Sequence, residues 1–249
     1  MGKTLDKPSG KALGRALGRR AQRVMTASNA SLRGSLWNER YQVMAEASDQ
    51  VPPSPCDCLS RYSALLPAQG KALDLASGRG GNALLLAAAG LEAHAWDQAD
   101  VALTQCRAFA ESASLTVHTR TVDVVAAPPE PLSFDVIVVS RFLDRALAPA
   151  LINALRPHGL LFYQTFVVGN RHGPSNPDYL LKPNELLTLF SGLQIRAYQE
   201  SGVLESEPSL KKQESVQGST QQSTQQSEQK QGADRQFLLH DEAFLIGQK

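Results

Sequence analysis

The feature that most constrains the fold is the segment Lys71–Asp97, KALDLASGRGGNALLLAAAGLEAHAWD. Its pattern predicts a strand over 71–76, a glycine turn over 77–81, a helix over 82–89 and a second strand from residue 92 that ends at Asp97. The turn needs residues without a Cβ, both for positive φ and for close approach of the backbone to a ligand. The segment therefore predicts an α/β domain with parallel strands.

The turn also carries a ligand-binding fingerprint. Gly78, Gly80 and Ala83 satisfy G-x-G-x-x-G/A, and Asp97 closes the second strand about twenty residues later. A nucleoside-containing ligand is therefore expected at the turn. Asp74, near the end of the first strand, would repel the pyrophosphate of a dinucleotide but suits a ligand with an ammonium and a sulfonium. S-adenosylmethionine is such a ligand, because its carboxylate can bind the helix N-terminus and its ribose hydroxyls can bind Asp97. A dinucleotide site and a turn without a ligand stay open.

The run LDLASGRGGNALLLAAAG, followed by Trp96-Asp97, resembles motif I and its acidic successor in class I S-adenosylmethionine-dependent methyltransferases. The W-x-x-R-Y pattern at 37–41 and the stretch 134–198 resemble the tellurite-resistance branch of small-molecule methyltransferases. In that branch the segment before motif I helps to cover the active site. The resemblance implies a Rossmann-like α/β fold, with a seven-stranded, mostly parallel sheet, helices on both faces and an antiparallel strand seven.

Further apolar runs predict the remaining elements. Strands three to six are expected at 115–122, 134–139, 160–166 and 193–198, and strand seven from the runs 237–239 and 242–246. Helices are expected over Cys56–Leu66 and after Asp100, which is a plausible N-cap, and Pro149 suits the first turn of another. The turn LRPHG at 155–159 is similar to the L-K/R-P-G-G turn of the family, with His158 in place of a glycine.

The cofactor site is expected around the glycine turn and at the carboxyl ends of the strands, where open α/β sheets bind their ligands. Its candidate residues are Asp74, Ala76, Gly78, Gly80, Asn82, Asp97, Asp123 and Ser140. The resemblance implies that Asp123 binds the adenine amino group, and the alternative is a polar residue at a strand end.

Arg141, Tyr163 and Tyr179 are the candidate catalytic residues, with Trp37–Tyr41 closing the site from above. Arg141 is a fixed positive charge for an anionic acceptor, and the alternative is that it only pairs with Asp144. No residue stands out as a general base; Asp144, Tyr163 and His172 are the candidates. The pair Cys56-x-Cys58 has no second cluster beside it, so no metal site is predicted.

Composition divides the chain into four parts. Residues 1–34 form a basic arm, 35–204 carry strands one to six of the methyltransferase domain, 205–233 are a Gln/Ser-rich insert, and 234–249 supply strand seven. The insert cannot bury enough apolar surface to order itself. The arm is rich in Arg and poor in acids, which is typical of an organellar transit peptide, of an arm that contacts RNA or anionic lipid, or of a solvated tail.

The predicted function is methyl transfer from S-adenosylmethionine to a small anionic or soft acceptor, such as a thiol, a metalloid oxyanion or a small acid. Ser140–Leu143 lacks the N/D-P-P-Y/F motif of many methyltransferases that act on nucleic-acid bases. With a net charge of +1, nucleic acid is not the favoured partner, although the arm leaves it open. The alternatives are an NAD-dependent oxidoreductase and a non-catalytic module that binds S-adenosylmethionine and RNA.

Cellular context follows from composition as well. Three cysteines do not make a disulfide framework, so a reducing compartment is expected, and the protein is predicted to be a cytoplasmic monomer or dimer. An organellar location is the alternative if 1–33 is a transit peptide. No uncharged apolar run approaches the ~18 residues of a membrane helix, so no membrane span is predicted.

Overall fold

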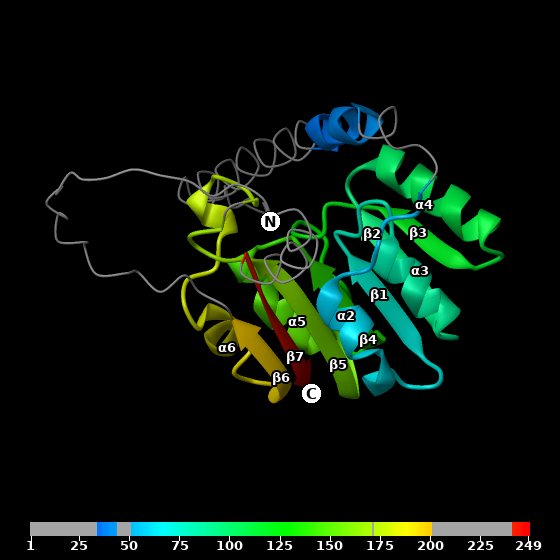
Figure 1. Cartoon of the computed structure of the whole chain (residues 1–249). Helices are drawn as coiled ribbons and strands as arrows, with labels where there is room; N and C mark the ends of the chain where they lie inside the picture. The colour runs from blue at the N-terminus through cyan, green and yellow to red at the C-terminus, as the bar shows by residue number, and fades with distance from the viewer. Residues whose placement is uncertain (1–33, 44–50, 171, 201–240) are drawn as a thin grey trace, which may run out of the picture.

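The computed structural model describes residues 34–43, 51–170, 172–200 and 241–249. The basic arm and the Gln/Ser insert lie outside these ranges, so what the sequence predicts for them stays a prediction. The described part contains a seven-stranded sheet in the order β3-β2-β1-β4-β5-β7-β6 (Figure 1). The strands are β1 (Lys71–Leu75), β2 (Glu92–Asp97), β3 (Val117–Thr121), β4 (Phe134–Ser140), β5 (Leu155–Phe166), β6 (Gln194–Glu200) and β7 (Glu242–Gln248).

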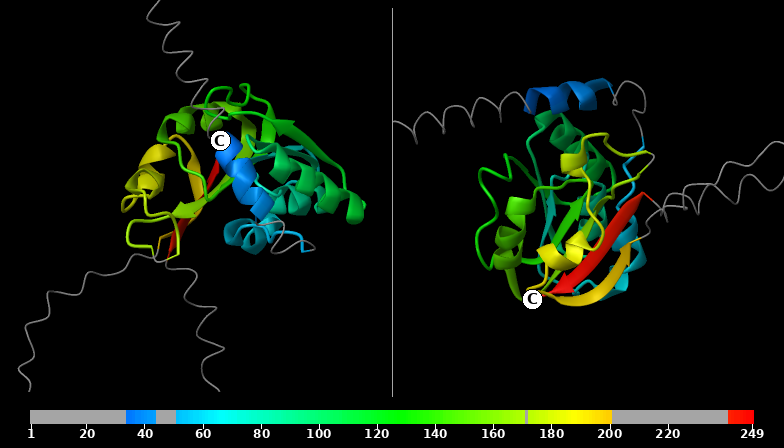
Figure 2. Two further views of the ribbon diagram at one scale, coloured as in Figure 1. Left: turned by 90° about the horizontal axis from the view of Figure 1, so that it is seen from above. Right: turned by 90° about the vertical axis from the view of Figure 1, so that its left-hand side faces the viewer.

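Helices cover both faces of this sheet. They are α2 (Asp57–Arg61), α3 (Gly81–Ala88), α4 (Asp100–Ser112), α5 (Ala148–Ala154) and α6 (Glu185–Leu189), with short 3-10 turns η1 (Ser63–Leu65), η2 (Arg145–Leu147) and η3 (Pro177–Tyr179). Residues 34–43 are helical too. Figure 1 shows α3 and α4 on one face of the sheet and α5 on the other, and the two views of Figure 2 agree.

The pairing confirms the predicted topology. β1 pairs in parallel with β2 and with β4, whereas β7 lies antiparallel between β5 and β6. The carboxyl ends of the parallel strands therefore meet at one edge of the sheet. The glycine turn and the residues that follow β2 and β4 are gathered at this edge, which is where ligands of such sheets bind.

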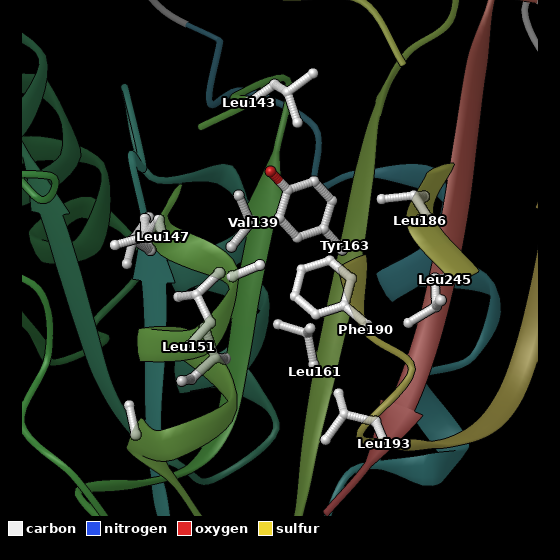
Figure 3. Packing of buried hydrophobic residues seen from close by; sticks show 14 of the residues in the cluster. Val139, Leu143, Leu147, Leu151, Leu161, Tyr163, Leu186, Phe190, Leu193 and Leu245 are labelled. Atoms are coloured by element: carbon white, nitrogen blue, oxygen red, sulfur yellow. The ribbon is translucent and has the colours of Figure 1, made fainter. Parts of the chain in front are cut away.

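Alternation along β4 explains its uninterrupted apolar run. Val136 and Val138 are buried in the cluster under α2 and α3, whereas Ile137 and Val139 are buried in the larger cluster under α5 and α6. Figure 3 shows part of the larger cluster, with leucines from α5 and β5 around Tyr163 and Phe190. A strand buried on both faces has no polar side, so FDVIVV carries one charge only, at its margin.

Three local predictions are corrected. Asp100 is not the N-cap of α4, because Ala99 holds that position and Asp100 lies in the first turn. The expected helix over 56–66 is divided into α2 and η1. β5 begins at Leu155 and not at residue 160, so the LRPHG segment is part of a strand, with a register shift against β4. His158 there has φ +66°, a left-handed conformation that favours the glycine found in the family's turn.

Within the described ranges, no helix combines the length and the apolar character that crossing a bilayer requires. The same residues contain no group of three or more His, Cys, Asp or Glu side chains placed to hold a metal ion.

Candidate functional site

The turn between β1 and α3 has the backbone that its glycines predict. Ala76, Gly78 and Gly80 all have positive φ, at 56°, 52° and 82°. Gly80 is the N-cap of α3, and a Cβ at this position would collide with the Cys106 sulfur. A Cβ at Gly78 would lie 2.6 Å from the hydroxyl oxygen of Tyr41. Both glycines are therefore required by close approach as well as by conformation.

Asp74 lies fully buried at the start of α3. Its Oδ2 accepts a hydrogen bond from the Ala83 amide at 3.1 Å, and its Oδ1 accepts one from Asn82 Nδ2 at 3.0 Å. Burial nevertheless raises the pKa of Asp74 to about 7, because these two donors only partly offset the loss of hydration. The Asp74 carboxylate itself therefore binds the Ala83 amide in the first turn of α3, whereas the sequence pattern assigned the helix N-terminus to the carboxylate of the ligand.

Asp97 closes β2 directly opposite the turn. Its Oδ2 accepts a hydrogen bond from the Gly78 amide at 2.7 Å, and its Oδ1 accepts one from the Ala99 amide at 2.8 Å. Burial raises the pKa of Asp97, while these amides act in the opposite direction. Each carboxylate oxygen has a second lone pair, so Asp97 is fixed in place and can still accept a hydrogen bond from a hydroxyl group of a ligand.

Asn82 connects this turn to β4. Its Nδ2 donates to Asp74 and also, at 2.9 Å, to the Ser140 hydroxyl, while its Oδ1 accepts from the Cys56 amide at 2.8 Å. The structure thus brings Asp74, Asn82 and Ser140 together, as the sequence predicts. Both N–H groups of the Asn82 side chain are used within the protein, which makes it a residue that positions Asp74.

Helix 34–43 lies above the carboxyl edge of the sheet (Figures 1 and 2). Asn38 Oδ1 accepts a hydrogen bond from the Val101 amide at 3.1 Å, which ties this helix to the start of α4. Tyr41 reaches down to Gly78, and burial together with Asp97 and Asp74 raises its pKa to about 12. The W-x-x-R-Y segment therefore lies where the sequence places it, over the glycine turn.

Among the candidate substrate residues, Arg141 and Tyr179 are exposed at this edge. The Arg141 side chain is 69% exposed, and its Nε donates to Glu242 Oε1 at 2.8 Å. Its partner is thus Glu242 of β7 and not Asp144, which caps η2 by accepting from the Ala146 amide. Tyr179 lies in η3 and is 51% exposed.

Tyr163 has different surroundings. It is buried in the larger core cluster against Phe190, and its hydroxyl donates to the Phe142 carbonyl at 2.9 Å (Figure 3). Burial raises the pKa of the hydroxyl, so this group stays protonated near neutral pH and is not available as a general base. Its contacts fit a residue that supports the loop after β4, and we do not carry it into the proposed substrate site.

Asp123 and His172 lie in loops at the same edge. Asp123 follows β3, and its Oδ1 accepts from the Val125 and Ala126 amides at 3.0 and 3.3 Å. His172 Nδ1 lies 2.6 Å from the buried Asp241 carboxylate, an arrangement that fixes which ring nitrogen faces the carboxylate.

Sequence reasoning missed the hydroxyl group of Ser77 at the turn. The Ser77 hydroxyl is buried and has no hydrogen-bond partner among the described residues. A buried hydroxyl of this kind, beside two carboxylates and two close-packed glycines, fits a site whose remaining partner is a polar ligand. Its place directly before the fingerprint was the available signal, but a serine in a glycine turn is too common to be singled out.

Comparisons with known proteins show a family and a fold. The model of the family described as "Tellurite resistance protein TehB" matches residues 56–201. Among solved structures, TehB from Haemophilus influenzae is similar with a TM-score of 0.54 and 17% identity, covering 82% of this chain and 65% of that one. This chain therefore spans less than two thirds of that protein's length.

Two further structures have the same fold. An S-adenosylmethionine-dependent methyltransferase from Mesorhizobium loti gives a TM-score of 0.51 at 15% identity, over 76% of this chain and 96% of that one. The [4+2]-cyclase SpnF gives 0.53 at 14% identity, over 81% and 84%. At such low identity these structures establish the fold alone. No curated protein sequence matches the chain.

Proposed function

This chain belongs to the tellurite resistance protein TehB family, and from that premise we propose that it transfers a methyl group from S-adenosylmethionine to a small anionic or soft acceptor. Membership of this family supports methyltransferase activity, with S-adenosylmethionine as the expected cofactor, and the class I fold is compatible with that activity. The acceptor classes proposed are a thiol, a metalloid oxyanion or a small acid.

The observation that supports the cofactor best is the position of Asp74. A carboxylate bonded to the Ala83 amide, in the first turn of α3, disfavours the pyrophosphate of a dinucleotide, which would meet like charge there. An ammonium group would instead be attracted. In the proposed arrangement Asp74 faces the ammonium, Asp97 accepts from the ribose hydroxyls, and the glycine turn lies beside the nucleoside. The NAD-dependent alternative is weakened by the same carboxylate.

The chemistry asks little of the protein beyond geometry. The sulfonium of the cofactor supplies an activated methyl group, so the chain has to align the acceptor and exclude water, which can lower a barrier by up to about 7–11 kcal/mol. Helix 34–43 is the element suited to exclude water, because Tyr41 lies against the glycine turn. A thiolate or oxyanion acceptor needs no general base.

On the acceptor side, Arg141 and Tyr179 are the proposed contacts. Arg141 directly follows Ser140, whose hydroxyl is bonded to Asn82, so its backbone lies beside the cofactor crevice. Its guanidinium is mostly exposed and suits an oxyanion. We also propose a cytoplasmic location, because three cysteines without a disulfide framework indicate a reducing compartment. A base in RNA would need a broad basic surface, whereas the whole chain has a net charge of +1.

The test is a screen with S-adenosylmethionine labelled in its methyl group. Small thiols, metalloid oxyanions, small acids and bulk RNA are each incubated with the full chain, and label in the product is measured. We expect transfer to one of the small acceptors. Transfer to RNA alone would contradict the proposal.

Two variants then locate the substrate site. Arg141→Ala and Tyr179→Ala are each expected to slow transfer at least tenfold, on the order of 1.4 kcal/mol, while S-adenosylmethionine binds as before. Arg196→Ala is the matched control, because this arginine lies on β6 and contacts Gln248. Full activity in both site variants would place the acceptor elsewhere.

A further inference from the structure

Two cysteines beside the proposed cofactor site form a pair that methyl transfer does not require. The sulfurs of Cys56 and Cys58 lie 3.6 Å apart. Residues two apart in a helix do not face each other, so a regular helix would separate these side chains. Cys56 is instead the extended N-cap of α2, with φ −64° and ψ 153°, and the chain becomes helical only at Asp57. This change of conformation turns both thiols to the same side.

The pair is held by hydrogen bonds to residues far away in the sequence. The Cys56 amide donates to Asn82 Oδ1, and the Cys58 amide donates to Gln164 Oε1, each at 2.8 Å. Asn82 and Gln164 are both buried. Because the backbone is fixed on both sides of Asp57, the two sulfurs are positioned before any ligand arrives, and little ordering entropy remains to be lost on binding.

Accessibility differs between the two thiols. Cys56 is half-buried and Cys58 is fully buried. The hydrogen bond with Cys56 and burial both raise the pKa of Cys58, so its thiol stays protonated at neutral pH. A reagent must therefore reach Cys56 first and close onto Cys58 afterwards.

The composition of the site limits what it can bind. A structural zinc ion needs four ligands, and no third metal-ligating side chain accompanies the pair within the described ranges. A trivalent metalloid differs, because two sulfurs are enough to displace two of its oxygen ligands and it keeps the third. We propose that Cys56 and Cys58 form a dithiol site for a trivalent thiophilic metalloid of the arsenous acid class.

Binding at this site involves no oxidation or reduction. Two sulfur–metalloid bonds form and two metalloid–oxygen bonds break, while each thiol proton leaves with a hydroxyl group as water. No thiolate has to exist beforehand, since the leaving hydroxyl takes the proton. The site shares Asn82 with the cofactor crevice, but the inference does not rest on the proposed methyl transfer, and its test measures binding alone.

Phenylarsine oxide is the probe, used on the reduced full chain with detection by intact-protein mass. Closure on two thiols predicts one adduct, with the mass of the reagent less one water. It should survive a large excess of a monothiol such as glutathione and be removed by a dithiol such as 2,3-dimercaptopropanol, because a chelate gains on the order of 100-fold or more in affinity.

Substitutions identify the sulfurs. Cys56→Ser and Cys58→Ser should each lose at least 100-fold in affinity for the probe. Cys106→Ser is the matched control and should keep the adduct, because Cys106 is a buried, isolated thiol in the core. Cys56 is half-buried, so its variant decides the matter even if Cys58→Ser fails to fold. Three results would each overturn the proposal: glutathione removes the adduct from the wild type, Cys56→Ser keeps the adduct, or Cys106→Ser loses it.

Discussion

Ionisation of Asp74 is expected to be coupled to cofactor binding. Burial raises the pKa of this carboxyl from 3.8 to about 7 in the free chain. In the proposed complex a cationic ligand faces the carboxylate and favours its ionised form, which lowers the pKa again. Below about pH 7 the free chain must therefore release a proton before the ligand binds well, and affinity should fall as the pH falls.

The size of this effect follows from the pKa. If the carboxyl titrates at about 7 in the free chain and well below that in the complex, the dissociation constant varies as one plus the ratio of protonated to ionised carboxyl. Between about pH 8 and about pH 6 this factor rises roughly tenfold, or about 1.4 kcal/mol. Calorimetric titration with S-adenosylmethionine across this range, in buffers of different ionisation enthalpy, measures both the affinity and the proton released.

Substitution separates Asp74 from other titrating groups. Asp74→Asn should remove the pH dependence of S-adenosylmethionine binding. Asp97→Asn should weaken the binding but leave its pH dependence in place. Because the folded-state pKa of Asp74 lies above its unfolded value, ionisation of this carboxyl opposes folding as the pH rises from about 4 to about 7. The melting temperature of the cofactor-free wild type should therefore fall as the pH rises from about 4 to about 7, and Asp74→Asn should flatten this fall. A flat profile in the wild type, or an equal slope in Asp74→Asn, would refute the reasoning.

Three further predictions concern the framework of the site. Gly80→Ala should lower the free energy of unfolding by about 1–3 kcal/mol in chemical denaturation, because the new methyl group meets the Cys106 sulfur. Adding Cys106→Ala should recover part of this loss, and no recovery would show that backbone strain is the whole cost. Arg145→Lys should speed amide hydrogen exchange around η3, because lysine cannot replace the guanidinium that binds Glu185 and two loop carbonyls at once. Unchanged exchange would show that these hydrogen bonds do not hold the loop. Replacing residues 207–232 by a short glycine-containing turn should leave the melting temperature and the cofactor affinity nearly unaltered, since loop closure costs only about 0.6 kcal/mol per doubling of loop length. A large fall in the melting temperature would show that the insert packs on the domain.

Much of the fold could be predicted because its signals are local. The run 134–139 is apolar without alternation, and only a strand buried on both faces requires that. The glycine turn needs positive φ at particular positions, and the structure has it at Gly78 and Gly80. The start of β5 was harder to predict, because a proline and a histidine at 157 and 158 indicate a turn. In the structure the C-terminal residues pair with this segment and extend the strand.

The site was predicted less completely, because its geometry depends on contacts between distant residues. Asp74, Asn82 and Ser140 could be placed together from topology, but the bond between the Asp74 carboxylate and the Ala83 amide could not. The same limit explains Arg141, whose partner Glu242 lies 101 residues further along the chain. Tyr163 was placed at the site by its strand, and only packing against Phe190 assigns its ring to the core.

The central claim is that the carboxyl ends of β1, β2 and β4 bind S-adenosylmethionine, and equilibrium calorimetry tests it most directly. The wild type should bind S-adenosylmethionine at one site and bind NAD far more weakly. Asp97→Ala should weaken S-adenosylmethionine binding at least tenfold, on the order of 1.5–3 kcal/mol for the lost charge-assisted hydrogen bonds, with a cooperative melting transition retained. Equal or tighter binding of NAD, or unchanged affinity in Asp97→Ala, would contradict the account.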